Sequence, residues 1–326
     1  MTTNGSAITA ERLVKTYAKD VRALNDLSFA VPRGTVFGLL GPNGAGKSTT
    51  IKILTTLTLP NSGMATVAEI DVLRRPNDVR RAIGVVTQRH GTDPQATGRE
   101  NLVLSGRIHG IAKHDAQHRA AELLDRFGLT EAADRIVRTY SGGMQRKLDI
   151  ALGLVHRPQV LFLDEPTTGL DPEARAQMWA EIRRLTRDEG ITILLTTHYL
   201  DEADQLAERL AIVDRGRLVI EGTPEQLKSE LRGDAVVAEL APDTSAEKAQ
   251  RVVAELPGIR DVTLEGRTVR ARVNDGAHSV PDVLAALDGV ALPVTAITVA
   301  RPSLDDVYLK HTGRSFAAAE TSEESK

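Results

Sequence analysis

The strongest constraint on this chain is a glycine-rich stretch at residues 41–48, which reads Gly-Pro-Asn-Gly-Ala-Gly-Lys-Ser. It matches the pattern G-x-x-x-x-G-K-[ST], and it follows a strand-like apolar run at residues 35–40 and precedes a helical pattern from Lys47. Glycines let the backbone wrap closely around phosphates and turn N–H groups inward, and the helix start adds its positive dipole end. Lys47 is expected to reach the β and γ phosphates, and the Ser48 hydroxyl to ligate Mg²⁺. The predicted phosphate contacts are Gly41, Pro42, Asn43, Gly44, Ala45, Gly46, Lys47 and Ser48.

The first two-thirds of the chain alternates short apolar runs with helical patterns, which predicts an α/β fold with a largely parallel sheet. Residues 7–31 look like antiparallel β material, and Arg215-Gly216 is the expected turn of a closing hairpin. The predicted strands after the phosphate loop are 83–87, 160–163, 191–197, 210–214 and 217–220, and the predicted helices are 112–127, 172–188 and 201–208.

The pattern changes after residue 222. Residues 235–299 are expected to run β-α-β-β-α-β, which is the order of a ferredoxin-like α+β domain. The last residues are small and acidic without an apolar period, so they are predicted to be disordered. The expected organisation is a nucleotide-binding domain over 1–222, a linker over 223–233, the α+β domain over 234–314 and a disordered tail over 315–326.

Composition narrows the possible functions. The 326 residues carry a formal charge of −3, which is too near neutral to argue for nucleic-acid binding, and the candidate strands of the second domain lack aromatic residues for base stacking. The absence of cysteine excludes disulfides and thiolate catalysis. The sequence contains no apolar run of 18 residues and no secretory signal at its start, so a membrane span would have to come from another chain.

Two adjacent carboxylates, Asp164 and Glu165, follow the apolar strand 160–163. They lie at its carboxyl end, the edge at which α/β sheets bind ligands. Successive side chains cannot share one direction, so the two carboxylates suit two tasks. Asp164 is expected to hold Mg²⁺, and Glu165 to orient or deprotonate the water that attacks the γ phosphate. The alternative is a capped turn before Pro166.

Two further polar residues end predicted strands at the same edge. His198 could donate a hydrogen bond to a γ-phosphate oxygen, although a histidine at a strand end is often only structural. Gln88 could sense Mg²⁺ or the attacking water with its amide, although in isolation it reads as a surface loop residue.

His114 and His118 are spaced i, i+4 on a polar helix face, but the sequence offers no third metal ligand near them.

A second glycine-rich helix start lies at Ser141, Gly142 and Gly143, and Ser141 is a good N-cap for the apolar stripe that follows. One folded sheet cannot easily bring two such helix starts onto one phosphate. The second start is therefore expected to serve a nucleotide held by another subunit.

Taken together, these motifs resemble the ATP-binding subunit of an ABC transporter. The resemblance covers roughly residues 7–222 and lies in the phosphate loop through Thr49, Gln88, residues 141–145 and 161–165, the Thr-Gly-Leu-Asp run at 168–171, and His198, in the family's order. The run at 301–309 resembles the daunorubicin/doxorubicin-resistance subfamily of drug exporters, and so do Tyr140 and Met144, which flank the Ser-Gly-Gly helix start.

The resemblance implies an ABC-type ATPase core with a helical subdomain, and a head-to-tail homodimer with two ATP molecules between the subunits. It places Lys47 of one chain and the turn at Ser141 of the other on each ATP, with Asp171 across the dimer interface and Tyr17 against the adenine. It implies ATP and Mg²⁺ as cofactors, the latter held by Ser48, Gln88 and Asp164, and catalysis by Glu165, His198 and Gln88.

A separate membrane-spanning permease is the implied partner, at the cytoplasmic face of the cell membrane. The implied function is ATP-driven export of a hydrophobic drug or antibiotic. The alternative is a soluble ABC-type ATPase acting on ribosomes or DNA. Ribosome-acting relatives usually carry two ATPase cores and DNA-repair relatives carry long coiled coils, whereas this chain has one core and no heptad run.

Overall fold

The computed structural model describes residues 5–231, 233–242 and 244–324. The chain divides into two compact units, Met1–Pro224 with His311–Lys326, and Glu225–Lys310. The first unit carries the phosphate loop, the paired carboxylates, His198 and the Ser-Gly-Gly helix start, and the run at residues 301–309 lies in the second unit. Across the parts of the chain that are described, we find no helix with the length and apolar character needed to span a bilayer.

The first unit is built on a six-stranded sheet in the order β10-β9-β3-β8-β7-β6. The inner strands run parallel, and β9 and β10 form the antiparallel hairpin expected at its edge. Because parallel strands end at one edge, the polar residues that follow them meet there. The strands are β3 (Val36–Leu40), β6 (Ile83–Val86), β7 (Val160–Asp164), β8 (Thr192–Thr197), β9 (Arg209–Asp214) and β10 (Arg217–Gly222).

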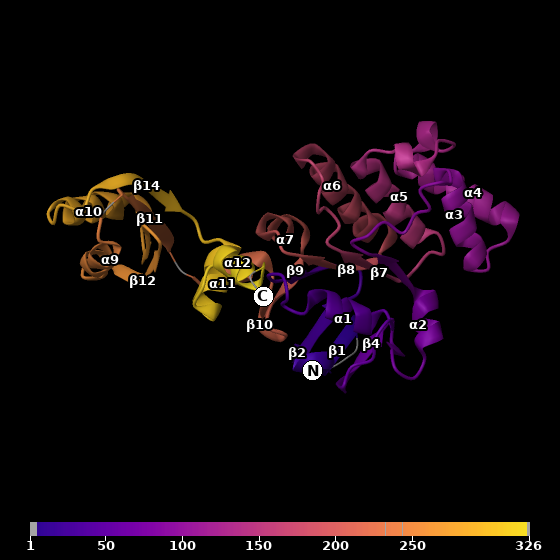
Figure 1. Cartoon of the computed structure of the whole chain (residues 1–326), viewed down its shortest axis with the longest axis horizontal. Helices are drawn as coiled ribbons and strands as arrows, with labels where there is room; N and C mark the ends of the chain where they lie inside the picture. The colour runs from indigo at the N-terminus through magenta and orange to yellow at the C-terminus, as the bar shows by residue number, and fades with distance from the viewer. Residues whose placement is uncertain (1–4, 232, 243, 325–326) are drawn as a thin grey trace. The chain divides into compact units, whose positions relative to one another are not determined.

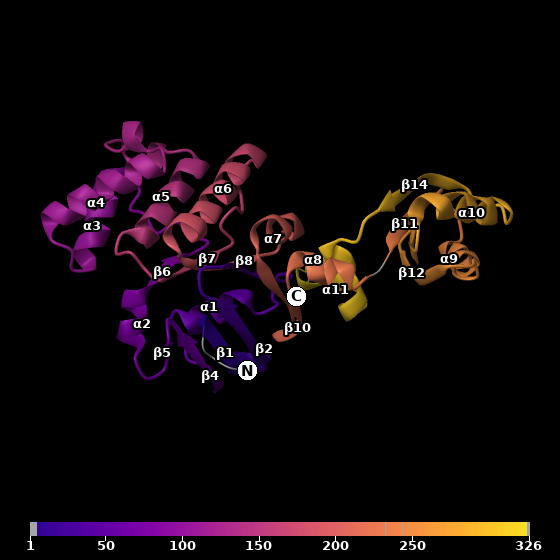
Figure 2. The ribbon, with the colours of Figure 1, turned by 180° about the vertical axis from the view of Figure 1, so that it is seen from behind.

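Helices cover both faces of this sheet, and strand β7 shows why. Val160 and Phe162 belong to a core shared with helix α1 (Lys47–Leu54), whereas Leu161 and Leu163 belong to a core shared with α5 (Gly142–Leu154) and α6 (Pro172–Glu189). Alternate strand residues point to opposite faces, so a continuously apolar strand binds helices on both sides. Figures 1 and 2 show α1 on one side of β7 and β8, and α5 with α6 on the other.

Two further layers complete the first unit. An antiparallel sheet in the order β2-β1-β4-β5 packs beside α1, and a group of helices precedes α5. The sequence predicted the first two of these strands and helix α4, but β4, β5 and α3 were missed. The bounds are β1 (Ser6–Thr16), β2 (Arg22–Pro32), β4 (Ser62–Val67), β5 (Ile70–Asp71), α2 (Pro76–Ala82), α3 (Gly98–Ile108), α4 (Lys113–Arg126) and α7 (Leu200–Leu206).

The second unit has the β-α-β-β-α-β order expected from the sequence. Its antiparallel sheet is ordered β12-β13-β11-β14. The first strand of the unit, β11, is therefore internal and pairs with the last strand, β14, which forms one edge. Val236, Ala238 and Val269 are among the residues that form its own core with the two helices. The elements are β11 (Asp234–Leu240), α9 (Ala246–Ala254), β12 (Ile259–Glu265), β13 (Thr268–Val273), α10 (Gly276–Asp288), β14 (Val294–Ala300) and α11 (Leu304–Thr312).

Two segments differ from the sequence expectation. The stretch expected as a linker over 223–233 begins with helix α8 (Pro224–Ser229), and the tail expected to be disordered over 315–326 contains helix α12 (Phe316–Glu324). Phe316 and Ala319 are buried in the first unit, so the tail is ordered by tertiary packing that its small acidic composition does not reveal.

Candidate functional site

The glycine-rich loop has the strand-to-helix geometry that phosphate binding requires. It leaves β3 and enters α1 at Lys47, with Gly44 at φ 74° and Gly46 at φ 104°, which is backbone that non-glycine residues rarely adopt. A Cβ added to Gly46 would lie 2.6 Å from the carbonyl oxygen of Ala23, so a side chain has no room there. Asn43, Gly44 and Ser48 are exposed, which leaves the concave side of the loop open to a ligand.

Lys47 is folded over its own loop. Its side chain is only 5% exposed, and Nζ donates hydrogen bonds to the carbonyl oxygens of Gly41 at 2.7 Å and Pro42 at 3.1 Å. Burial lowers the pKa of Lys47, and the carboxylates of Glu165 and Asp164 oppose that effect. The ammonium group is therefore held at the mouth of the loop, beside the carboxylates predicted to act with it.

Glu165 is the centre of the site. Its Oε1 lies 3.1 Å from His198 Nδ1 and 3.9 Å from Lys47 Nζ, and its Oε2 accepts hydrogen bonds from Gln88 Nε2 at 3.2 Å and Thr168 Oγ1 at 3.4 Å. Burial by itself would raise the pKa of Glu165, but the contact with His198, followed by Lys47 and Thr168, brings it below its usual value. The carboxylate is thus kept ionised in a half-closed site.

His198 forms the other half of this pair. Its contact with Glu165 raises its pKa, while burial and the charge of Lys47 act in the opposite direction. Glu320, on helix α12, also raises the pKa of both His198 and Lys47, so its charge is felt at the phosphate loop. The segment that leads to α12 is held to the first unit by Arg314, whose Nη2 donates hydrogen bonds to both carboxylate oxygens of Asp214 at the end of β9.

Asp164 faces the phosphate loop rather than Glu165. Its Oδ1 accepts a hydrogen bond from Thr196 Oγ1 at 2.6 Å and lies 3.4 Å from Ser48 Oγ. The β7–β8 register places Asp164 directly opposite Thr196, which explains the first contact. The Ser48 hydroxyl and the Asp164 carboxylate are oxygen donors of the kind that Mg²⁺ prefers, whereas the Gln88 amide is hydrogen-bonded to Glu165. The residues present therefore fit this ion.

The turn at Ser141 lies apart from this cluster. Ser141 caps α5 by accepting a hydrogen bond from the backbone N–H of Met144 at 3.3 Å, and both Ser141 and Gly142 are exposed. A Cβ on Gly142 would have no heavy atom of this chain within 4 Å. Because α5 and α1 pack on opposite faces of the sheet, this open helix start and the one at Lys47 face different surroundings.

The remaining predicted residues are also outside the cluster around Glu165. Asp171 caps α6 by accepting from the N–H of Ala174 at 2.8 Å and is exposed. Tyr17 follows β1, is 38% exposed, and has the Lys15 ammonium 5.1 Å from its ring centre. Thr49 is half-buried in the first turn of α1. His114 and His118 each contact only a nearby carboxylate, of Asp115 and Glu122 respectively, and within the ranges described no three histidine or acidic side chains gather as a metal site.

Sequence reasoning missed several residues that support the site. Thr196 could have been found from its position, two residues before His198 on the strand next to Asp164. Glu202, which is fully buried, accepts hydrogen bonds from Thr167 Oγ1 at 2.7 Å and Trp179 Nε1 at 3.2 Å, and thereby links the chain after His198 to the chain after Glu165. Burial raises the pKa of Glu202. Arg146 and Asp149, both buried on α5, were the clearest omission, because charged residues in a helix are normally read as its solvent face.

A phosphate loop joined to two carboxylates, together with a separate Ser-Gly-Gly helix start, defines an ATPase of the ABC transporter class. Residues 24–168 match the family described as ABC transporter, and residues 222–312 match the family described as ATP-binding protein DrrA1-3-like, C-terminal domain. The chain belongs to the ABC transporter ATP-binding proteins of the DrrA daunorubicin/doxorubicin-resistance type, and it is an ABC transporter ATPase. The resemblance inferred from the sequence is confirmed.

Several relatives are similar over nearly their whole length. The daunorubicin/doxorubicin resistance ATP-binding protein DrrA of Streptomyces peucetius is 47% identical over 94% of this chain and 92% of its own. The doxorubicin resistance ATP-binding protein DrrA of Mycobacterium tuberculosis H37Rv is 42% identical over 96% and 95%. The linearmycin resistance ATP-binding protein LnrL of Bacillus subtilis is 34% identical over 94% and 98%.

Solved structures support the fold. The cbiO1 protein of Clostridium perfringens, described as part of the ABC transporter complex cbiONQ, aligns with a TM-score of 0.65 and 25% identity over 78% of this chain and 97% of its own. A dimeric ATP-binding cassette in a post-hydrolysis state, bound to ADP and phosphate, aligns with a TM-score of 0.61 and 25% identity over 66% and 98%. The expected fold, an ABC ATPase core followed by an α+β domain, is confirmed.

Proposed function

We propose that this chain is the motor of an exporter of hydrophobic drugs or antibiotics. Two copies close head to tail over two ATP molecules, hydrolysis reopens them, and the motion drives a separate membrane-spanning subunit at the cytoplasmic face of the membrane. The relatives from Streptomyces, Mycobacterium and Bacillus, which carry resistance to such compounds in their names, support this choice of cargo.

The observation that carries the proposal is the set of groups around one carboxylate. Glu165 is ionised by its surroundings and lies within 4 Å of Lys47, Gln88 and His198. An ionised carboxylate of this kind can accept a proton from water, while Gln88 orients that water. Lys47 turns from its own loop carbonyls to the phosphates of ATP, and His198 donates to the γ phosphate, so that charge developing there meets fixed donors.

Mg²⁺ would be held by Ser48, Asp164 and the side-chain oxygen of Gln88. When bound, it neutralises phosphate charge and orients the terminal phosphate. The chain prepares for this by holding Asp164 in place through Thr196. We therefore assign the metal ion to Asp164 and the attacking water to Glu165.

The open helix start at Ser141 supports the homodimer. The N–H groups of Ser141, Gly142 and Gly143 are available to bind an anion. That anion would not be the phosphate bound at residues 41–48 of the same chain. We assign them to the ATP held by the second copy, with Asp171 at the same interface, Thr49 beside the phosphates and Tyr17 stacked on adenine. The dimeric neighbour bound to ADP and phosphate supports this arrangement.

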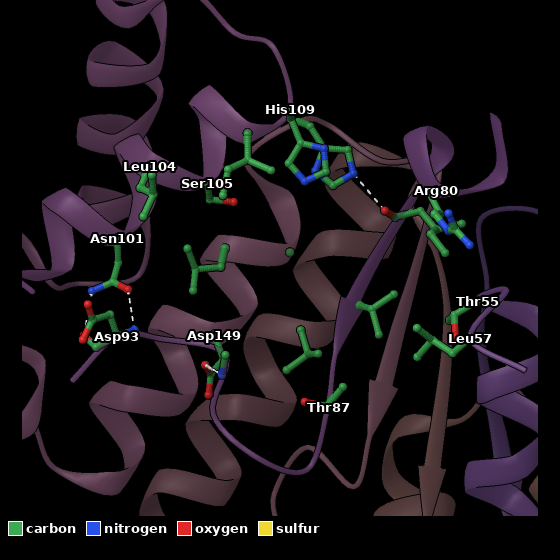
Figure 3. Close-up of a pocket in the computed structure, with 18 residues that line it drawn as sticks. Thr55, Leu57, Arg80, Thr87, Asp93, Asn101, Leu104, Ser105, His109 and Asp149 are labelled. Carbon is green, nitrogen blue, oxygen red and sulfur yellow. Dashed lines mark hydrogen bonds between the residues drawn. The ribbon is translucent and has the colours of Figure 1, made fainter. Parts of the chain in front are cut away.

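A cavity beside the Gln88 loop supports the membrane partner. It has a volume of about 590 Å³ and lies between β6 and helices α3 and α5, as Figure 3 shows. Leu57, Leu104 and Ile108 line it and are exposed by 67%, 58% and 75%, respectively. Exposed apolar groups in a hollow favour a protein partner. A segment of the membrane subunit seated there would touch the loop that carries Gln88.

The test combines hydrolysis with trapping of the dimer. Glu165→Gln should bind ATP but hydrolyse it at least a hundredfold more slowly, and it should elute as a nucleotide-bound dimer in size-exclusion chromatography. Because the chain has no cysteine, Ser48→Cys and Gly142→Cys can be placed on separate Glu165→Gln molecules, and they should cross-link when ATP is present. Wild-type turnover of Glu165→Gln, or the absence of a cross-link between the two variants when ATP is present, would reject the mechanism. Co-purification with ribosomes instead of a membrane protein would support the alternative function.

A further inference from the structure

Arg146 is a buried arginine whose hydrogen bonds go to the backbone of catalytic loops. It lies on α5, five residues after the cap residue Ser141, and is 4% exposed. A guanidinium group presents five N–H donors in a rigid plane, so it can hold several carbonyls in one arrangement. Arg146 donates from Nε to Pro166 O at 2.7 Å, from Nη1 to Thr87 O at 2.7 Å, and from Nη2 to Asp164 O at 3.0 Å and Glu165 O at 3.1 Å.

These carbonyls belong to the two loops that carry the water-handling residues. Thr87 directly precedes Gln88, and the other three carbonyls flank or belong to Glu165. Glu165 has φ 48°, in the left-handed region that is unfavourable for a residue with a side chain. Such a conformation persists only when neighbouring contacts hold it, and Arg146 supplies contacts on both sides of it.

Asp149 extends the same link by one helical turn. It is 4% exposed, and its Oδ1 accepts a hydrogen bond from the N–H of Gly91 at 3.0 Å, while Oδ2 lies 2.5 Å from His90 Nδ1 and 4.0 Å from Arg146 Nη1. Figure 3 shows Asp149 beside the chain that follows Thr87. Helix α5 therefore holds the segment around Gln88 before and after that residue.

We propose that Arg146 is a positioning residue for hydrolysis, which fixes Glu165 and Gln88 to the helix that begins at Ser141. A displacement of α5 is then passed through the guanidinium group to both loops. This inference rests on the proposed homodimer, in which Ser141 touches the ATP of the second copy. In that dimer, binding of ATP at Ser141 would change the positions of Glu165 and Gln88 through α5 and Arg146. Asp149 assists by holding the loop after Gln88.

The first test separates positioning from binding. Arg146→Lys keeps the charge but replaces the planar fork with a single ammonium group, which cannot reach all four carbonyls. We expect kcat for ATP hydrolysis to fall at least tenfold while KM changes less than twofold, because the phosphate contacts of Lys47 are unaltered. Lys147→Met is the matched control, since Lys147 lies on the same helix and contacts only Gln177 in the part of the chain described. It should keep wild-type kcat and KM.

A double-mutant comparison tests whether Arg146 acts through Glu165. In single-turnover hydrolysis, Arg146→Lys should slow the wild type tenfold or more but the Glu165→Gln variant less than twofold, because residues that act as one unit are not additive. Independent, multiplicative losses would overturn the proposal, as would an unchanged kcat or a loss confined to KM. Failure of Glu165→Gln to slow hydrolysis at all would instead reject the proposed base.

Asp149→Asn covers the case in which Arg146→Lys does not fold, as judged by thermal unfolding. The substitution keeps an oxygen for the N–H of Gly91 but removes the charge opposite Arg146. We expect kcat to fall about threefold or more with KM unchanged. A folded Asp149→Asn protein with wild-type kcat, in the absence of a usable Arg146 variant, would count against the link.

Discussion

Replacing Asp306 with alanine should destabilise the second unit far more than the same change at its neighbour. Asp306 is 3% exposed, and its carboxylate lies 2.9 Å from Arg270 Nε and 2.8 Å from Arg272 Nη2, and accepts from the Ser303 N–H at 2.9 Å. Removing one partner of a buried ion pair leaves uncompensated charge and costs about 3–5 kcal/mol. A unit of this size is stable by about 5–15 kcal/mol, so the loss is a large fraction of the total.

Hydrogen exchange measured by mass spectrometry is the suitable assay. Each 1.4 kcal/mol is a factor of ten, so the slowest amides of the central strand β13 should exchange about two to four orders of magnitude faster. Asp305→Ala is the control, because Asp305 lies in the same helical turn but is 30% exposed and 3.9 Å from Arg270 Nη1, a contact worth under about 1 kcal/mol.

The single tryptophan, Trp179, reports on the other unit, so its urea unfolding transition should not shift in either variant. Equal acceleration of exchange in Asp306→Ala and Asp305→Ala would refute the reasoning, since it would mean that burial of the Asp306 pair contributes nothing. A shift of the Trp179 transition would show that the two units do not unfold separately.

Three further predictions concern the first unit. The contact between Glu165 and His198 lowers the pKa of Glu165 and raises that of His198. The stability that this contact contributes is therefore complete between the ordinary pKa values of about 4.3 and 6.5, and it is lost as pH falls through the Glu165 pKa or rises through the His198 pKa. In thermal unfolding from pH 5 to 9, the His198→Gln protein should lack the loss of stability that the wild type shows as pH rises, and parallel curves of the two proteins against pH would contradict this. Leu104→Glu should abolish stimulation of ATP hydrolysis by the membrane subunit but leave basal hydrolysis within twofold, and retained stimulation would argue against the cavity as the docking place. Glu320→Gln removes a negative charge that acts on Lys47 and His198. Because this charge would repel the phosphates of ATP, the variant should bind ATP about two to five times more tightly, and the difference should shrink at high salt. Weaker binding by the variant would refute this.

The residues that could be predicted from the sequence are those whose local pattern determines their position. The phosphate loop has its own strand and helix, and the run at 160–165 combines a strand apolar on both faces with carboxylates at its end, so Lys47, Asp164 and Glu165 could be placed together. The β-α-β-β-α-β order of the second unit was likewise visible in its alternating apolar runs.

What could not be predicted depends on contacts between distant segments. Arg146 looks like an ordinary polar residue of a helix, and only the folded chain shows the carbonyls around its guanidinium group. Helix α12 has small and acidic residues that indicate disorder, yet it belongs to the first unit and its Phe316 and Ala319 are buried. Local propensity is a weak guide where tertiary packing supplies the stability.

The return of the chain to the first unit at His311 makes the second unit an insertion rather than an appendage. A protease that cuts once near residue 224 would leave the second unit attached only through the non-covalent packing of the segment after His311, which includes the contact of Arg314 with Asp214, and release of Glu225–Lys310 alone would require two cuts. Truncation after β10 would also remove α12. The better way to remove the second unit is to excise 225–310 and rejoin the flanking residues with a short glycine-serine bridge, and exchange of that segment between relatives would create chimaeras with an unaltered ATPase.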